Sequence, residues 1–283
     1  MRLPIHPMPA LGSPIDLVRP VGKRGRRSRY RGGVSIPLAM TLLGLVLLAA
    51  VIQRVAGLGL GMLFAPYAVV LIGAHQGIML ANFLGTLMPL LLLPRIWDRI
   101  QWRTVAWIGL PAVAVMPGAA WLSSVSPPGP LYIVTASLVL LSLLISVALV
   151  RVHTIVDGRT AQVVTGIGSG LGTVLGGVGG PAVTVYAVLS RWPVLPMVAT
   201  LQPLWILISS VSFASKLAWD DGQVPDLPWW MWAAMVAIVI ASIFLGEAVQ
   251  NRLAERTIQR FVMVLGFVGA LLALGTGVRL LVG

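Results

Sequence analysis

Two glycine-rich stretches interrupt an otherwise apolar chain: Gly57-Leu58-Gly59-Leu60-Gly61 and Gly176-Gly177-Val178-Gly179-Gly180-Pro181. Glycine and proline disrupt a helix and leave backbone N–H and C=O groups without helical partners. Hydrocarbon penalises such groups, so unwound backbone at membrane depth survives only inside protein or beside a water-filled cavity. In membrane proteins built from two halves, breaks at corresponding positions are the best sequence indicator of a transport site.

The composition predicts an integral membrane protein. Of the 283 residues, 58% are apolar and 10% are charged, whereas a soluble domain has about half and about a quarter. Several apolar runs approach the ~20 residues that a spanning helix needs. We therefore predict an all-α fold, a polytopic helical membrane protein with 8–10 transmembrane segments, from two homologous halves with glycine-broken or re-entrant helices. The ten apolar segments lie at about 36–53, 57–73, 77–94, 104–122, 130–150, 160–175, 178–190, 197–217, 228–247 and 261–280.

An internal repeat divides the apolar region. Tyr67-Ala68-Val69 recurs as Tyr186-Ala187-Val188, and the same offset of about 119 residues places Gly57 on Gly176. One duplication explains these matches, as in many transporters. The predicted parts are a disordered, basic cytoplasmic tail at 1–33, a first membrane repeat at 34–155 and a second at 156–283.

Charge predicts the orientation, because Lys and Arg near helix ends favour the cytoplasmic side. Three arginine-containing loops are expected there: 95–103, 151–159 and 252–260. The uncharged loop 123–130 and the acidic loop 220–226 are expected outside. If all ten segments cross the membrane, these loops lie on their expected sides and the two halves are inverted relative to each other. The amino terminus would then lie outside, which conflicts with the cytoplasmic side that its basic tail predicts. Either residues 36–73 cross once as a broken helix, or part of each glycine-broken pair is re-entrant.

The tail carries much of the net charge of +12, with eight Lys or Arg and one acid in residues 1–31. A run such as Lys23–Arg27 is compatible with nucleic acid, but this tail abuts a hydrophobic helix. We therefore expect anionic lipid headgroups as its partner, and no nucleic acid. A homo-oligomer is left open.

The motifs of common enzymes are missing from the sequence. There is no cysteine, which excludes disulfides, thiolate metal sites and cysteine nucleophiles. The three histidines are far apart in sequence, and neither a phosphate-binding loop nor a nucleophile elbow is found. We predict a protein that is not an enzyme, with no catalytic residue, no metal and no cofactor.

The second break resembles a known motif. The residues that carry the resemblance are Gly168, Gly170, Gly172, the 176–181 stretch, Tyr186, Pro193 and Ala199-Thr200. They resemble the sulfite exporter TauE/SafE family, also called the toluene sulfonate uptake permeases, whose duplicated members open each half with a glycine-rich stretch and a proline. The first half is more degenerate, with Pro66, and with Ala81-Asn82 in place of alanine-threonine.

The resemblance spans residues 36–280. It implies movement of small sulfur-containing or organic anions, such as sulfite, organosulfonates and related carboxylates, across a bacterial-type cytoplasmic (inner) membrane. The corresponding expectation is a secondary transporter with alternating access, coupled to H⁺ or Na⁺. The alternatives are a lipid-headgroup or channel-like translocator, and a non-transporting membrane scaffold.

An anion in a low-dielectric bundle needs fixed donors. Backbone N–H groups after Gly61 and after Gly180 would supply them at helix N-termini, and Pro181 suits a first helical turn. The alternative is that these glycines only let helices pack closely.

Polar side chains near the breaks are further candidates. Asn82 and Thr86 share one helical face, and Thr200 and Gln202 open another segment; these residues either bind the anion or bond between helices. Arg54 and Gln53 are candidates to hold the anion, and the alternative for Arg54 is to snorkel to the cytoplasmic interface. Lys216 is expected to pair with Asp220 or Asp221. The candidate binding residues are Gly57, Gly59, Gly61, Asn82, Thr86, Gly176, Gly177, Gly179, Gly180, Pro181, Thr200, Gln202 and Arg54.

Overall fold

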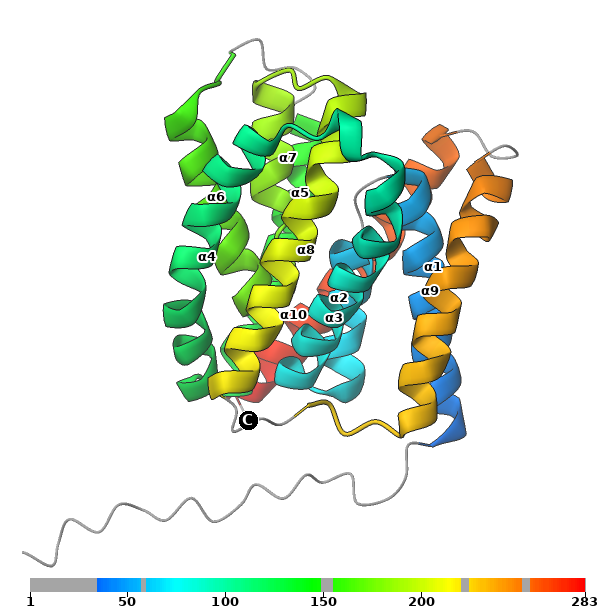
Figure 1. The fold of residues 1–283 in the computed structure, drawn as a ribbon. Coiled ribbons are helices and arrows are strands. Elements are labelled where there is room, and N and C mark those ends of the chain that lie inside the picture. Colours follow the sequence, from blue (N-terminus) through cyan, green and yellow to red (C-terminus); the bar gives the residue numbers. More distant parts are fainter. Residues whose placement is uncertain (1–34, 57–59, 149–154, 220–223, 251–254, 283) are drawn as a thin grey trace, which may run out of the picture. The chain divides into compact units, whose positions relative to one another are not determined.

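The computed structural model describes residues 35–56, 60–148, 155–219, 224–250 and 255–282. Over these residues the chain forms ten α-helices and two short 3-10 helices (Figure 1), so the all-α prediction is confirmed. Each predicted apolar segment is one helix, with its ends shifted by a few residues. The helices are α1 (Ile36–Ala56), α2 (Leu60–Ile72), α3 (Ala74–Leu92), η2 (Leu93–Arg95), η3 (Trp97–Arg99), α4 (Trp102–Val125), α5 (Pro128–Ala148), α6 (Arg159–Gly176), α7 (Gly180–Leu189), α8 (Val194–Trp219), α9 (Trp229–Gln250) and α10 (Glu255–Val282).

The helices differ in their reach across a bilayer. Among the described residues, seven helices are long and apolar enough to span a membrane: α1, α3, α4, α5, α8, α9 and α10. The helices that follow the two breaks are shorter, with 13 residues in α2 and 10 in α7. Because a spanning helix needs about 20 residues, α2 and α7 each reach only part of the way.

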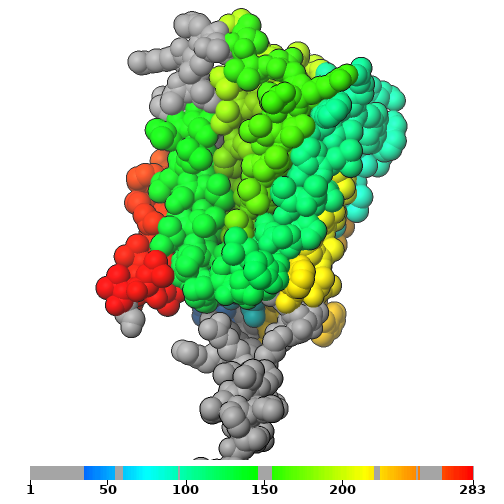
Figure 2. Space-filling model, turned by 90° about the vertical axis from the view of Figure 1, so that its left-hand side faces the viewer, coloured from blue at the N-terminus to red at the C-terminus, as the bar shows by residue number. Residues whose placement is uncertain are grey.

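The outer surface is apolar, as a lipid-facing surface must be. Figure 2 shows one face, on which α5, α6 and α4 lie side by side. These helices expose large side chains that include Leu110, Leu141, Leu144, Val164 and Leu171. Soluble monomers rarely expose large contiguous apolar patches, whereas a hydrocarbon environment favours such a surface.

Part of the glycine content serves helix packing. A Cβ atom added to Gly170 on α6 would lie 2.6 Å from the carbonyl oxygen of Ala112 on α4. Gly166, one turn earlier, meets the carbonyl oxygen of Ile108 in the same way. Small residues spaced by four let two membrane helices approach backbone to backbone. The packing alternative therefore holds for these two glycines, which lie outside the breaks.

The second break turns the chain back as a hairpin. At the far end of α7, the backbone N–H of Val156, which precedes α6, donates to the carbonyl oxygen of Leu189 at 3.0 Å. The α6–α7 hairpin therefore opens toward the end of the bundle that carries residues 93–101, 155–159 and 189–194, which we name the arginine end (Figure 1).

The first break turns the chain back in the opposite sense. Val69 and Ala74, around the end of α2, share a core cluster with Leu131 in the first turn of α5. Figure 1 shows that α1 begins at this same end, together with the ends of α4 and α8. We name it the Lys216 end, with residues 72–74, 123–128, 216–219 and 224–229. A single broken crossing of residues 36–73 is therefore excluded, and the re-entrant alternative agrees with the structure.

The start of α1 repeats the conflict seen in the sequence. Ile36 lies at the Lys216 end, whereas Arg99 and Arg159 lie at the arginine end. The positive-inside rule applied to these arginines makes the arginine end cytoplasmic. Residues 1–34 lie outside the described residues, so the cytoplasmic position of the basic tail stays a prediction.

The chain has no cysteine, so a thiol reagent labels only a cysteine that is introduced by mutation. The side from which that cysteine reacts reports the topology of the helix end that carries it. We expect Asp98→Cys to react with a membrane-impermeant maleimide only from the cytoplasmic side, and Ser126→Cys only from the outside. The reason is that residues 98 and 126 lie at opposite ends of α4. Labelling of intact cells and of inverted vesicles measures this. Reaction of both cysteines from one side would contradict the helix arrangement.

Candidate functional site

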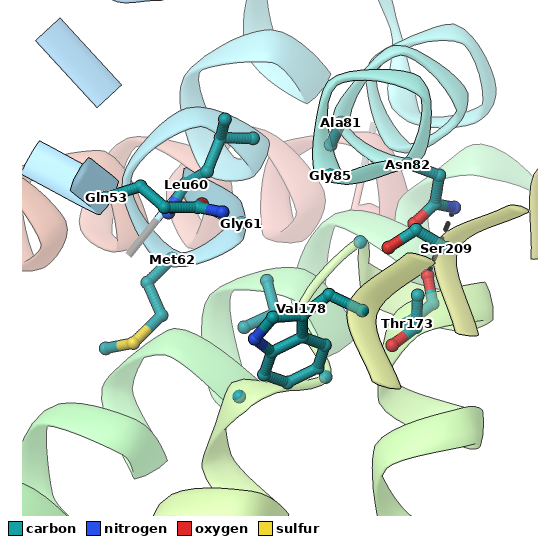
Figure 3. Close-up of a pocket in the computed structure, with 14 residues that line it drawn as sticks. Gln53, Leu60, Gly61, Met62, Ala81, Asn82, Gly85, Thr173, Val178 and Ser209 are labelled. Atoms are coloured by element: carbon teal, nitrogen blue, oxygen red, sulfur yellow. Dashed lines mark hydrogen bonds between the residues drawn. The ribbon is translucent and has the colours of Figure 1, made fainter. Parts of the chain in front are cut away.

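The two glycine breaks line one interior cavity of about 50 Å³ (Figure 3). Its walls come from α1, α2, α3, α6, α7, α8 and the segment between α6 and α7. The lining residues are Gln53, Leu60, Gly61, Met62, Ala81, Asn82, Gly85, Thr173, Gly177, Val178, Gly179, Gly180, Trp205 and Ser209. Segments separated by more than 100 residues in sequence therefore meet at one point.

The breaks touch each other directly. A Cβ atom added to Gly61 would lie 2.8 Å from the carbonyl oxygen of Gly177, closer than real Cβ contacts come. Gly177 ends α6 in the left-handed region with φ 69°, which glycine adopts without strain. The next N–H, of Val178, donates to the carbonyl oxygen of Gly172 at 3.1 Å. Glycine at positions 61 and 177 thus permits both the turn and the contact.

Two helices begin at this cavity, α2 at Leu60 and α7 at Gly180. The first N–H groups of a helix have no acceptor within it, and they carry a partial positive charge. In α2, the N–H of Leu60 donates to the Gln53 side-chain oxygen at 3.1 Å. In α7, Pro181 occupies the second position, where its missing N–H costs no helical hydrogen bond.

Gly179, directly before α7, lies against two hydroxyls of α6. A Cβ atom added to Gly179 would lie 2.8 Å from Ser169 Oγ, and closer still to Thr173 Oγ1. Thr173 Oγ1 donates to the Ser169 carbonyl oxygen at 2.7 Å. Ser169 Oγ is buried without a hydrogen-bond partner among the described residues. Ser169 is fully buried and is not among the residues that line the cavity.

Asn82 joins three helices at the wall of the cavity. Its side-chain nitrogen donates to Ser212 Oγ on α8 at 2.7 Å and to the Thr173 carbonyl oxygen on α6 at 3.4 Å. Figure 3 shows Asn82, Thr173 and Ser209 grouped on one side of the cavity, opposite Gln53 and Leu60. Thr86 Oγ1 donates to the carbonyl oxygen of Asn82 at 3.0 Å. The amide of Asn82 is therefore held in place, and Thr86 stands one turn behind it.

Five of the thirteen predicted binding residues line the cavity: Gly61, Asn82, Gly177, Gly179 and Gly180. Pro181 and Thr86 flank it. Gly57 and Gly59 lie outside the described residues.

The remaining four candidates lie elsewhere. Thr200 Oγ1 accepts a hydrogen bond from the Gln101 N–H at 3.0 Å, at the arginine end. The Gln202 side-chain nitrogen donates to the carbonyl oxygen of Val198 at 3.0 Å. Gly176 faces Leu138 and Thr135 of α5, and the Arg54 side chain packs on Gly246 of α9. The structure does not bring these four residues to the cavity.

Thr173, Trp205 and Ser209 line the cavity but were not among the candidates. The repeat could have indicated two of them. The 119-residue offset aligns Trp205 with Thr86 and Thr173 with Arg54, and both Thr86 and Arg54 were candidate binding residues. Ser209 carried no such signal. It faces Gly85 of α3, where an added Cβ atom would lie 2.9 Å from Ser209 Oγ.

A second, open cavity of about 630 Å³ lies at the arginine end, where α4 and α6 begin. Arg103 and Arg159 line it, with Asp157 as its acid. The Arg159 guanidinium carbon stands 5.2 Å from the ring centre of Trp107, a cation–π geometry. Tyr186 OH donates to Asp157 at 2.8 Å, which ties α7 to the start of α6. Two arginines against one aspartate leave this vestibule with net positive charge, which attracts anions.

A family model described as sulfite exporter TauE/SafE matches residues 42–273, from within α1 to within α10. The chain belongs to the sulfite exporter TauE/SafE family. The resemblance drawn from the glycine motifs is thereby confirmed, and this TauE/SafE protein is a multi-pass membrane transporter of the sulfite-export type. Comparisons with curated proteins and with solved structures found no match.

The contact between the breaks predicts the effect of one added methyl group. We expect Gly61→Ala to destabilise the folded protein by about 1–3 kcal/mol, because the methyl group meets the Gly177 carbonyl oxygen and the backbone must move. Thermal unfolding in detergent measures this. The matched control is Gly118→Ala on α4, where nothing lies within 4 Å of the added atom. Equal melting temperatures for the two variants would contradict the contact.

Proposed function

We propose that this TauE/SafE protein is a secondary transporter that binds a small anion in the central cavity. The observation that carries the proposal is the convergence of the N-termini of α2 and α7 on one interior cavity. An anion that leaves water for a low-dielectric interior needs fixed donors or positive charge. Helix N-termini provide both, and transporters use broken helices in this way for anionic groups.

The lining of the cavity supports a small oxyanion. Besides the two helix N-termini, Ser209 brings a hydroxyl group to the lining, whereas the donors of Asn82 and Thr173 are used in hydrogen bonds within the protein. The cavity measures about 50 Å³, and one water-sized group needs about 10–15 Å³. Room for about four such groups suits sulfite, with one sulfur and three oxygens, better than a bulky aromatic sulfonate. We therefore propose sulfite or a similarly small sulfonate or carboxylate as substrate.

The helix arrangement supports alternating access. The two hairpins open to opposite ends of the bundle (Figure 1), and both line the cavity, through Gly61 and Gly177. The first helix of each half packs on the fourth helix of the other half, α1 on α9 and α6 on α4. An inverted repeat predicts such an exchange, and inverted repeats transport by rocking one half against the other. We propose that this motion exposes the cavity to each side in turn.

The setting of the proposed transport is the bacterial inner membrane, with the arginine end in the cytoplasm. The positively charged vestibule at that end would gather anions before they reach the cavity. H⁺ or Na⁺ is the proposed driving ion, and anionic lipid is the proposed partner of the basic tail. The N-terminal tail is not needed for the cavity, whose lining begins at Gln53.

A carboxylate placed in the cavity tests the charge of the substrate. Gln53→Glu keeps an oxygen acceptor for the Leu60 N–H and adds a negative charge. We expect the KM for sulfite to rise about 10- to 100-fold, since two like charges a few ångströms apart repel strongly at low dielectric. Labelled-sulfite flux in proteoliposomes measures this. An unchanged KM in a folded Gln53→Glu protein would contradict an anion in this cavity.

Filling the cavity tests its position. We expect Gly180→Leu to reduce sulfite flux by about tenfold or more, because its side chain occupies space that the substrate needs, and overpacking of this kind is poorly tolerated. The matched control is Gly118→Leu, at an exposed position with open space around it. If both variants transport like the wild type, the substrate route lies elsewhere.

A further inference from the structure

One lysine is buried at the Lys216 end. Lys216 on α8 is 1% exposed, and its ammonium group donates to Ser123 Oγ on α4 at 2.7 Å. Lysine is almost never fully buried in proteins unless it is paired. An ionisable side chain inside a membrane bundle is costly, and it marks a substrate or ion pathway by default.

Lys216 ends a polar seam that begins at the cavity. Ser209 lines the cavity, and Ser212 accepts the hydrogen bond from Asn82, one turn before Lys216. All three α8 residues are buried, at 6%, 0% and 1% exposure. Residues spaced by three and four share one face of a helix. The seam from Ser209 to Lys216 covers seven residues, which corresponds to about 10 Å along the helix axis.

Neighbouring helices supply the opposite wall of this seam. Asn82 and Gly85 of α3 face Ser212 and Ser209, and Ser123 of α4 faces Lys216. The rest of α8 is largely apolar. The seam is thus a buried polar connection that leads from the cavity to the Lys216 end.

We propose that Lys216 forms a second anion subsite, where the transported anion is held at the Lys216 end of the bundle, beyond the central cavity. The inference rests on the proposed function and deepens it. About 10 Å from the cavity, an anion no longer benefits from the N-termini of α2 and α7, whose effect is confined to the first turn. A lysine offers a compact positive charge on a flexible stem with three N–H donors. The Ser123 and Ser212 hydroxyls flank it.

The competing explanation is a purely structural ion pair. Three acids follow α8 in sequence: Asp220 and Asp221, which lie outside the described residues, and Asp226, which lies at the Lys216 end. A pair with any of these acids would anchor the end of α8 without touching the substrate. Removing the acids tests this, because a structural pair fails when either partner is lost, whereas an anion subsite fails only when the lysine charge is lost.

The experiment compares labelled-sulfite flux and equilibrium sulfite binding for the wild type, Lys216→Gln, Lys216→Arg and Asp220→Asn/Asp221→Asn/Asp226→Asn. We expect Lys216→Gln to lower the maximal flux about tenfold or more, while binding at the central cavity changes less than about threefold. Lys216→Arg keeps the charge and should retain about half of the flux or more. The control Arg279→Gln removes an exposed cation near the end of α10 and should transport normally.

Several results would overturn the inference. Normal flux in Lys216→Gln would do so, as would equal losses in Lys216→Gln and Lys216→Arg, or a loss in Asp220→Asn/Asp221→Asn/Asp226→Asn as large as that in Lys216→Gln. If Lys216→Gln does not fold, Ser123→Ala takes its place, with an expected threefold or so loss of flux and unchanged central binding; normal flux there also overturns it. A wild type without flux would sink both the proposed function and this inference.

Discussion

The structure depends on one constraint: backbone polar groups that leave a helix inside a membrane must be sheltered by protein or water. The two breaks shelter each other. Gly61 at the start of α2 lies against the Gly177 carbonyl oxygen at the end of α6, with no room for a side chain between them. Around this contact α3 and α8 complete the wall, and Asn82 bonds to both α6 and α8. The cavity lies where the start of α2 packs against the end of α6.

This arrangement gives the cavity its chemistry. Each break ends one helix and begins another, so two positive helix ends point to one place from opposite directions. The two ends of the bundle then differ in charge placement. The arginine end offers an open vestibule with Arg103 and Arg159, whereas the Lys216 end holds one buried lysine behind a serine seam. An anion that crosses the bundle would thus meet positive charge in three successive places.

The elements of the fold were predictable because membrane helices must satisfy their own backbone, so apolar runs and glycine breaks show directly in the sequence. The breaks also located part of the site, since Gly61, Gly179 and Gly180 line the cavity. Which way each hairpin opens was not predictable, because charge rules alone left two alternatives for residues 36–73. The core cluster of Val69, Ala74 and Leu131 decides it for the first hairpin, and the hydrogen bond between Val156 and Leu189 decides it for the second.

Side-chain positions on the long helices were harder to predict. Asn82 and Thr200 look like repeat equivalents, but the 119-residue offset places Asn82 on Leu201. One residue turns a side chain by about 100° around a helix. Thr200 accordingly meets Gln101 at the arginine end, while Asn82 reaches the cavity. Ser209 is found only from the packing of α8 on α3, because neither periodicity nor the repeat marks it.

The most direct test of the central claim is anomalous diffraction from crystals of the protein soaked with selenite, a heavier analogue of sulfite. If two glycine breaks form the anion site, the strongest selenium peak will lie between Gly61 and Gly179, within hydrogen-bond reach of the first turn of α7. A strongest peak away from both breaks, with none in the central cavity, would contradict the account.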